Sequence, residues 1–312
     1  MNALSMKHLR YFEALSRIGH FGRAAEACAI SQPALSMQIR ELEALIGAPL
    51  VERAARRVRL TALGEEFASR ARDILRRVDQ LGDLVRAAGD EPGGILRIGV
   101  IPTVAPYLLP GLIQHLTRRW PALDLRPREA VTRTLLTDLT AGRLDLAILA
   151  LPVSEPALEE VPLIEEEFLL VRPRSDAGRP VPDAARLAEM KLLLLEEGHC
   201  FRDQALSFCK IPASRAPRDL MEGSSLSTLV QMVGAGIGVT LIPEMALPIE
   251  TKSARVAVDR LAAPHPKRVI GMVWRRSNPL GPQLMRIAAL LNQSLPAMLP
   301  EQNLPHGSPH QP

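Results

Sequence analysis

The stretch "RAAEACAISQPALSMQIRELEALIGAPLVER", residues 23–53, decides the fold of the N-terminal part of this 312-residue chain. Its first residues form the end of a short helix. Ser31 and Pro33 are residue types that begin a second helix, and Gly47 is typical of the position just after one. Leucine and isoleucine recur at three- and four-residue spacing along one side of this second helix. Two short helices joined by a tight turn predict a helix-turn-helix, whose second helix enters the major groove of DNA.

The polar residues around the second helix suit double-stranded DNA. Its early part carries hydrogen-bond donors and acceptors for base edges and phosphates. The arginine-rich segment "PLVERAARRVRL" that follows is typical of a wing that lies along the phosphate backbone. We predict a winged helix-turn-helix over residues 1–61 whose DNA-binding residues are Ser31, Gln32, Pro33, Ser36, Gln38, Arg40, Arg53, Arg56 and Arg57. Residues 1–60 hold nine Lys/Arg against five Asp/Glu, and this surplus equals the net charge of the whole chain, +4.

The segment "TALGEEFASRARDILRRVDQLGDLVRAAG" predicts one long amphipathic helix over residues 62–88. A stripe of apolar residues along its length favours a coiled-coil-like linker and dimerisation segment, which we assign to residues 62–92. The following "GDEPGG" breaks the chain with glycine and proline and marks a domain boundary.

Beyond this boundary, short apolar segments alternate with helical patterns, which predicts an α/β domain with a parallel sheet and helical crossovers. The predicted strands are "ILRIGVIP", "LDLRPREA", "LDLAILA", "FLLVRPR", "KLLLLEEG", "GVTLIP" and "RVIGMVWRR". The loops after the first and fifth of them carry Thr103 and His199, at the edge where ligands of such sheets bind. The glycines of "VGAGIGVTLIP" precede a strand instead of following one, which argues against a dinucleotide site.

The chain has no apolar run long enough to span a membrane and no signal-peptide pattern, so we expect a cytoplasmic protein. Three cysteines in a reducing compartment argue against a permanent disulfide framework. The last residues, 299–312, are rich in proline and polar residues, and we expect a disordered tail.

Two of the cysteines lie in "LEEGHCFRDQALSFCK", residues 195–210. A metal site with His199, two inert buried thiols and a redox pair are all compatible with this segment; for Cys28 we expect a core thiol. If 200–209 is helical, nine rises of ~1.5 Å separate Cys200 and Cys209 by ~13–14 Å, whereas a disulfide tolerates no more than ~7 Å. Oxidation to a disulfide would therefore require refolding, as a two-state switch does. The helix N-terminus, together with His199 and Arg202, would favour the reactive thiolate.

The arrangement of residues 23–53 resembles the LysR-type transcriptional regulators. That resemblance implies an all-α winged helix-turn-helix with a long linker helix and an α/β, periplasmic-binding-protein-like regulatory domain over residues 93–298. Two subdomains are implied there, one formed by 93–164 plus 270–298 and the other by 165–269.

The segments "IPTVAPYLLP", "LDLAILALP", "EEGHCFRDQALSFC" and "GSSLSTLVQMVGAGIGVTLIP" are similar to the hydrogen-peroxide-sensing branch of that family. By this resemblance Cys200 is the peroxidatic thiol and Cys209 its disulfide partner, and a peroxide pocket is formed by Thr103, Thr132, His199 and Arg268. It also implies an activator of oxidative-stress genes that acts as a homotetramer (a dimer of dimers) with RNA polymerase and is reduced by glutaredoxin or thioredoxin. No cofactor, metal or membrane is implied. The segment "KIPASRAPRDLMEGS" departs from the branch in its basic residues and prolines.

Two other functions stay open. A small organic effector could bind between the subdomains, near Thr103, Ser224 and Ser225. A thiol peroxidase would use the same cysteines as a catalyst, but the N-terminal helix-turn-helix argues against an enzyme.

Overall fold

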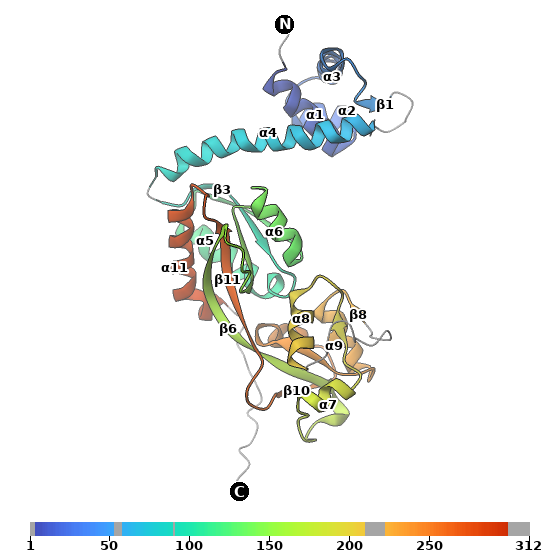
Figure 1. The fold of residues 1–312 in the computed structure, drawn as a ribbon, viewed down its shortest axis with the longest axis vertical. Coiled ribbons are helices and arrows are strands. Elements are labelled where there is room, and N and C mark those ends of the chain that lie inside the picture. Colours follow the sequence, from blue (N-terminus) through green and yellow to red (C-terminus); the bar gives the residue numbers. More distant parts are fainter. Residues whose placement is uncertain (1–3, 53–57, 90, 210–221, 299–312) are drawn as a thin grey trace. The chain divides into compact units, whose positions relative to one another are not determined.

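The computed structural model describes residues 4–52, 58–89, 91–209 and 222–298. The chain divides into two compact units, Met1–Val85 and Arg86–Pro312 (Figure 1). The elements up to the end of the long helix are α1 (Met6–Ile18), α2 (Phe21–Ala27), α3 (Gln32–Ile46), β1 (Val51–Glu52), β2 (Arg59–Leu60) and α4 (Ala62–Ala87). The elements of the second unit are β3 (Gly94–Val100), α5 (Ala105–Arg119), β4 (Leu123–Glu129), α6 (Thr132–Thr140), β5 (Leu146–Leu151), β6 (Leu158–Pro173), η1 (Arg174–Asp176), α7 (Ala184–Glu189), β7 (Leu194–Leu195), α8 (Cys200–Phe208), β8 (Glu222–Gly223), α9 (Leu226–Gly234), β9 (Thr240–Pro243), η3 (Glu244–Ala246), α10 (Leu247–Glu250), β10 (Val256–Arg260), β11 (Lys267–Arg275) and α11 (Gly281–Met298).

The first unit is the predicted winged helix-turn-helix. Ser31 caps α3, because its hydroxyl accepts a hydrogen bond from the Ala34 N–H at 3.3 Å. Gly47 ends α3 with φ 79°, a left-handed conformation that glycine adopts without strain. Strands β1 and β2 pair antiparallel, with Val51 opposite Leu60. Buried side chains of α1, α3 and the loop before β1 form the core of this unit, among them Phe12, Leu15, Leu35, Leu42 and Leu50.

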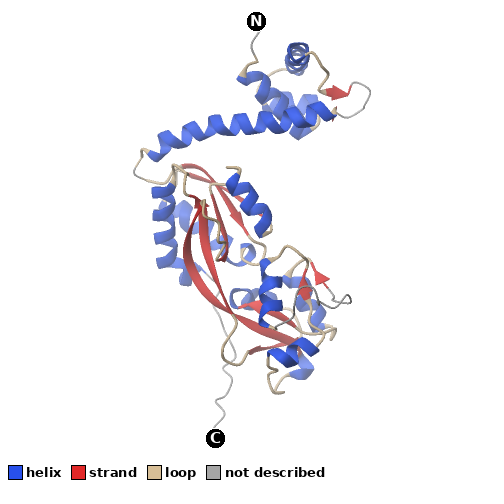
Figure 2. Ribbon diagram, in the orientation of Figure 1, coloured by secondary structure: helices blue, strands red, loops and turns tan. Residues whose placement is uncertain are grey.

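The second unit contains a mixed sheet, so the prediction of a parallel sheet is wrong for most of it. The seven described strands follow the order β10-β6-β11-β5-β3-β4, with β9 also paired to β6. Figure 2 shows the strands in red and the helices around them in blue. Only β3 pairs in parallel within this sheet, with β4 and β5. Strand β11 returns from the far end of the chain and lies antiparallel between β5 and β6. The alternation of strand and helix patterns along the sequence could not predict that β11 lies between β5 and β6, because β11 is about a hundred residues away from both in the chain.

Strand β6 is much longer than its predicted part, "FLLVRPR". Its first ten residues, "LEEVPLIEEE", include five glutamates and so lack the apolar pattern of a strand. Neighbouring strands supply basic partners for these glutamates: Lys267 contacts Glu165 at 2.8 Å and Arg260 contacts Glu167 at 2.6 Å. In Figure 1, β6 runs from the part of the sheet beside α5, α6 and α11 to the part beside α7, α8 and α9.

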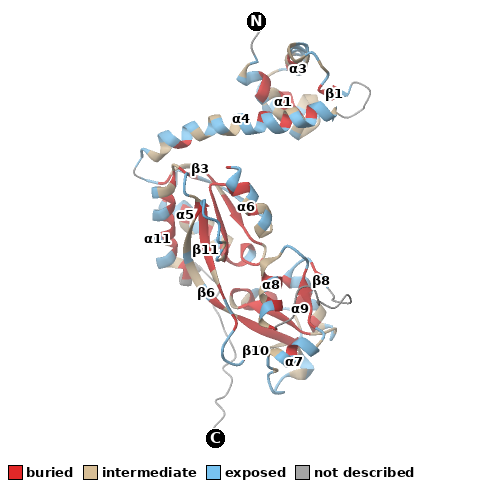
Figure 3. Cartoon of the chain, viewed as in Figure 1, coloured by how far each residue is buried: buried red, intermediate tan, exposed pale blue. Residues whose placement is uncertain are grey.

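The predicted subdomain boundaries fall on this long strand pair. Glu165 and Val269, the first and last residues of the predicted second subdomain, are register partners in β6 and β11. The two places where the chain passes between the predicted subdomains therefore lie side by side. The division into subdomains stays a prediction. The inner strands of the sheet are largely buried, as Figure 3 shows, and form one core with the helices around them.

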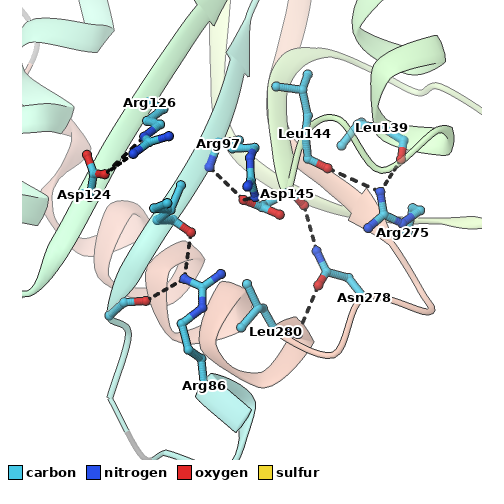
Figure 4. Close-up of polar contacts among 12 residues, drawn as sticks. Arg86, Arg97, Asp124, Arg126, Leu139, Leu144, Asp145, Arg275, Asn278 and Leu280 are labelled. Carbon is cyan, nitrogen blue, oxygen red and sulfur yellow. Dashed lines mark hydrogen bonds and ion pairs between the residues drawn. The ribbon is translucent and has the colours of Figure 1, made fainter. Parts of the chain in front are cut away.

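The second unit begins at Arg86, whose contacts are drawn in Figure 4. Its Nη1 donates to the carbonyl oxygens of Gly93 at 2.9 Å and Ile95 at 2.7 Å. Nearby, the Asn278 amide donates to the Asp145 carbonyl at 3.0 Å. The Arg86 side chain thus fixes the backbone where the chain enters β3, the first strand of the second unit. Within the described residues, each helix is too short or too polar to cross a bilayer.

Candidate functional site

The helix predicted between the two cysteines is present. Helix α8 begins at Cys200 and ends at Phe208, with Cys209 at its C-terminal cap. Gly198, at φ 96°, takes a backbone conformation that few other residues adopt, and it turns the chain from β7 toward the helix. Both cysteines are free thiols. At ~1.5 Å per residue, their Cα atoms are ~13–14 Å apart, about twice the span of a disulfide.

The two thiols differ in their surroundings. Cys200 is half-buried, whereas Cys209 is 2% exposed and belongs to the core. Burial raises the pKa of the Cys209 thiol to about 11. In this conformation Cys209 therefore stays protonated at neutral pH and is shielded from solvent. The expectation of a core position for Cys28 is only half met, because this thiol is half-buried at the end of α2.

The two basic side chains expected beside Cys200, Arg202 and His199, do not bring an uncompensated positive charge to it. Arg202 forms an ion pair with Glu222 and donates to the Leu195 carbonyl oxygen at 3.3 Å. Burial lowers the pKa of His199 and outweighs the nearby carboxylates of Glu196 and Glu129, which raise it. The imidazole is therefore uncharged near pH 7. Cys200 is the first residue of α8 and so lies at the N-terminal end of the helix, which carries positive partial charge.

Arg268 and Thr103 form a buried pair. The Nη1 of Arg268 donates to the Thr103 hydroxyl at 2.8 Å, and its Nη2 donates to the Thr103 carbonyl oxygen at 3.0 Å. Its Nε donates to Glu166 at 2.8 Å, and Glu166 also accepts the Met245 N–H at 2.9 Å. The guanidinium carbon lies 5.4 Å from the ring centroid of Phe201, the second residue of α8. Strands β6 and β11 thus fix both the Thr103 hydroxyl and the first turn of the cysteine helix.

A cavity of about 90 Å³ adjoins these residues. Thr103 and His199 both line it, as do Ser224 and Ser225, which we expected near a small effector. Arg268 and Cys200 are not among the lining residues, but Arg268 is hydrogen-bonded to Thr103, and Cys200 directly follows His199 in the chain. The lining residues are Pro102, Thr103, Pro106, Tyr107, Glu129, Leu195, His199, Ser224, Ser225, Leu226, Ser227 and Glu250.

Thr132 is outside that lining but close to the loop before α8. It begins α6, and its Oγ1 is buried without a hydrogen-bond partner among the described residues. A Cβ placed on Gly198 would lie 3.8 Å from a methyl group of Val131, so the loop and the start of α6 are in contact. An unpaired buried hydroxyl is costly, which makes Thr132 a candidate for binding a small polar ligand.

Sequence reasoning missed three ionisable residues of the cavity, Tyr107, Glu129 and Glu250. Glu129 ends β4, and the rule that sheet ligands lie beyond strand ends could have found it. Glu250 and Tyr107 gave no such signal, because α5 and α10 meet only in the folded chain. The Tyr107 hydroxyl donates to Glu250 at 2.7 Å, and burial together with this hydrogen bond raises the pKa of Tyr107 well above its ordinary range. In the described part of the chain, His, Cys, Asp and Glu form no group of three that could hold a metal ion.

The predicted DNA-binding residues that the structure describes lie on α3 or at its N-cap. Gln32 and Pro33 are exposed in the first turn of α3. Gln38 donates to Glu41 at 2.9 Å, and Arg40 is exposed, with its Nε 3.3 Å from the Ser36 carbonyl oxygen. Arg53, Arg56 and Arg57, like the predicted tail 299–312, lie outside the described residues.

Family models match both parts of the chain. The model "Bacterial regulatory helix-turn-helix protein, lysR family" matches residues 6–65, and the model "LysR substrate binding domain" matches residues 89–296.

Similar proteins cover nearly the whole chain. A Streptomyces viridosporus protein named probable hydrogen peroxide-inducible genes activator is 42% identical over 93% of this chain and 94% of its own length. The DNA-binding transcriptional dual regulator OxyR of Escherichia coli is 42% identical over 91% of this chain and 94% of its own. Among solved structures, full-length Pseudomonas aeruginosa OxyR with a cysteine-to-aspartate substitution has a TM-score of 0.68 and 34% identity, covering 93% of this chain and 98% of that one. A Corynebacterium glutamicum OxyR cysteine-to-serine mutant with H2O2 bound has a TM-score of 0.65 and 33% identity, covering 94% of this chain and 93% of that one.

Proposed function

Since this chain belongs to the LysR family of bacterial transcriptional regulators, we propose that it activates genes in response to hydrogen peroxide. Its N-terminal unit binds double-stranded operator DNA, and its regulatory unit senses the peroxide through Cys200. The active form is a homotetramer, a dimer of dimers, that acts on RNA polymerase. A thiol reductant such as glutaredoxin or thioredoxin resets the sensor. The similarity to OxyR over the whole chain supports this assignment.

The sensing chemistry takes place in two steps. The Cys200 thiolate attacks one peroxide oxygen, the O–O bond breaks, and the other oxygen leaves as hydroxide, which takes up a proton to become water. Sulfur is oxidised to a sulfenic acid and the peroxide is reduced. The Cys209 thiol then attacks the sulfenic sulfur and a second water leaves, which forms the disulfide. A reduced dithiol returns both cysteines to thiols and is itself oxidised to a disulfide.

The observation that carries this proposal is the position of the two cysteines at opposite ends of α8. A disulfide between them cannot form while the helix is intact, so the second step must unwind it. The unwinding also removes Cys209 from the core, where its burial favours the helical form. Oxidation and refolding are thereby linked, which is what a switch requires.

The residues around the cavity fit the first step. The Thr103 hydroxyl is already held by Arg268, and Thr132 has a buried hydroxyl without a partner among the described residues. We assign both hydroxyls to hydrogen bonds with the peroxide. His199 is uncharged and can take up or return a proton, and Arg268, paired with Glu166, holds the Thr103 hydroxyl in place for its hydrogen bond to the peroxide.

Replacing single cysteines tests the mechanism. Cys200→Ser should abolish peroxide-dependent transcription and keep DNA binding, whereas Cys209→Ser should accumulate a sulfenic acid at Cys200 that a dimedone probe detects. Mass spectrometry of the native chain should find a Cys200–Cys209 disulfide after brief peroxide treatment, reversed by thiol. Cys28→Ser is the matched control and should respond as the native chain does. A normal peroxide response of Cys200→Ser would refute the mechanism.

One observation favours a second candidate, a regulator that binds a small polar effector. Thr103, Ser224 and Ser225 line one cavity of about 90 Å³, as expected for such a site. A metabolite that raises the melting temperature of Cys200→Ser and of the native chain equally would support this candidate.

A further inference from the structure

The cavity beside His199 has an uneven distribution of charge. Two carboxylates line it, and its lining within the described residues includes neither lysine nor arginine. Glu129 is exposed and Glu250 is buried. The other polar groups of the lining are hydroxyls and the imidazole.

The nearest positive charge does not compensate for these carboxylates. Arg268 is buried behind Thr103 with its guanidinium 2.8 Å from the Glu166 carboxylate, so this pair is neutral as a whole. His199 is uncharged near pH 7, because its burial lowers the imidazole pKa. The Tyr107 hydroxyl donates a hydrogen bond to Glu250 and keeps its proton, so it carries no charge. Among the side chains of the described lining, the charged groups are therefore the two carboxylates of Glu129 and Glu250.

We infer that Glu129 and Glu250 make this cavity selective for uncharged oxidants and repel anionic ones. The inference rests on the proposed function, in which oxidants reach Cys200 from the cavity that its neighbour in the chain, His199, lines. Hydrogen peroxide is uncharged and can exchange hydrogen bonds with the hydroxyls of the lining. An anion entering the same space would meet two negative charges in a partly desolvated site, where electrostatic repulsion is stronger than in water.

Peroxymonosulfate, HSO5⁻, is a suitable anionic probe. The Cys200 thiolate attacks its terminal peroxide oxygen, the O–O bond breaks, and sulfate leaves in place of hydroxide. The sulfur product is the same sulfenic acid, so one assay follows both oxidants. The neutral control is tert-butyl hydroperoxide, which has the same number of heavy atoms and gives tert-butanol. Comparing these two probes separates the effect of charge from the effect of size.

The experiment measures second-order rate constants of Cys200 oxidation in the full-length chain carrying Cys28→Ser and Cys209→Ser, so that one thiol reacts. In Glu129→Gln, which keeps the side-chain size, the ratio of the peroxymonosulfate to the hydrogen peroxide rate constant should rise about tenfold. The ratio for tert-butyl hydroperoxide should stay the same. Without the glutamate change, raising the salt concentration should speed the anionic reaction and leave the neutral ones constant, because salt screens repulsion.

Glu189→Gln is the matched control, since Glu189 is an exposed carboxylate on α7 outside the cavity. Glu250→Gln should change the ratio in the same direction as Glu129→Gln. An unchanged ratio in both cavity variants, with Cys200 still oxidised by hydrogen peroxide, would overturn the inference and leave the proposed function intact. Failure of hydrogen peroxide to oxidise Cys200 in the chain with both glutamates would overturn both.

Discussion

At the scale of single residues, the pair of Arg268 and Glu166 is fully enclosed by the protein. The Arg268 side chain is 0% exposed and that of Glu166 is 3% exposed. Taking two charges out of water is costly, and this cost is offset here by hydrogen bonds to Thr103 and Met245 as well as by the ion pair itself. The same contacts fix the Thr103 hydroxyl, which we assign to the proposed peroxide site, so under this proposal both stability and sensing would depend on Arg268.

Replacing Arg268 should lower the free energy of unfolding much more than replacing an exposed arginine does. Arg268→Met leaves the Glu166 carboxylate buried without its partner and should lower the free energy of unfolding by about 3–5 kcal/mol. Arg276→Met removes a surface partner of Glu159, 2.7 Å away, and should cost less than about 1 kcal/mol. Both tryptophans, Trp120 and Trp274, lie in the regulatory unit, so fluorescence during urea denaturation reports on it. Equal losses in the two variants would contradict this interpretation.

At the scale of elements, the long antiparallel pair of β6 and β11 holds the regulatory unit together. Its register shifts between Ile270 and Gly271. A Cβ on Gly271 would lie 2.8 Å from the Val161 carbonyl oxygen and 2.3 Å from a methyl group of Leu151. The close approach of the neighbouring strands to β11 therefore depends on a residue without a side chain.

Gly271→Ala should lower the free energy of unfolding by about 1–3 kcal/mol, because backbone atoms must move to admit the methyl group. Gly82→Ala is the opposite case, since a Cβ there meets no atom within 4 Å and α4 gains a better helix former. That variant should be more stable by up to about 1 kcal/mol. Urea denaturation followed by circular dichroism measures both. Stabilisation by Gly271→Ala would show that the strands adjust freely.

At the scale of the whole molecule, the predicted DNA contacts and the cysteine switch belong to different compact units. The helix-turn-helix lies within Met1–Val85, and both switch cysteines lie within Arg86–Pro312. Because α3 and α8 belong to different compact units, we expect refolding of α8 to leave α3 itself unchanged. In the proposed tetramer, oxidation should therefore change the spacing of the DNA-binding units and not their individual contacts.

Operator binding should persist in both redox states of the native chain, while the length of the DNase I footprint changes on peroxide treatment. Cys200→Ser should give the footprint of the reduced form with and without peroxide. Loss of operator binding on oxidation would show that the switch controls affinity and not spacing.

The sequence alone determined the local features of this protein. Caps such as Ser31 and Gly47, the apolar spacing of α3 and α4, and the helix between Cys200 and Cys209 follow from residue types and periodicity, which act within a few residues. The family motif and the candidate residues Thr103 and His199 were also visible, since strand ends in α/β domains point to ligand sites.

Only the tertiary structure decided how distant segments meet. The glutamate-rich half of β6 is a strand because it pairs along its length with β11, a pairing that also brings Lys267 to Glu165. Arg268 reaches Thr103 across 165 residues, and Tyr107 reaches Glu250 across 143. Such pairs have no periodic signal in the chain, because their free energy arises from burial and charge pairing that exist only after folding. The mixed sheet and the acidic lining of the cavity therefore had to be seen in three dimensions.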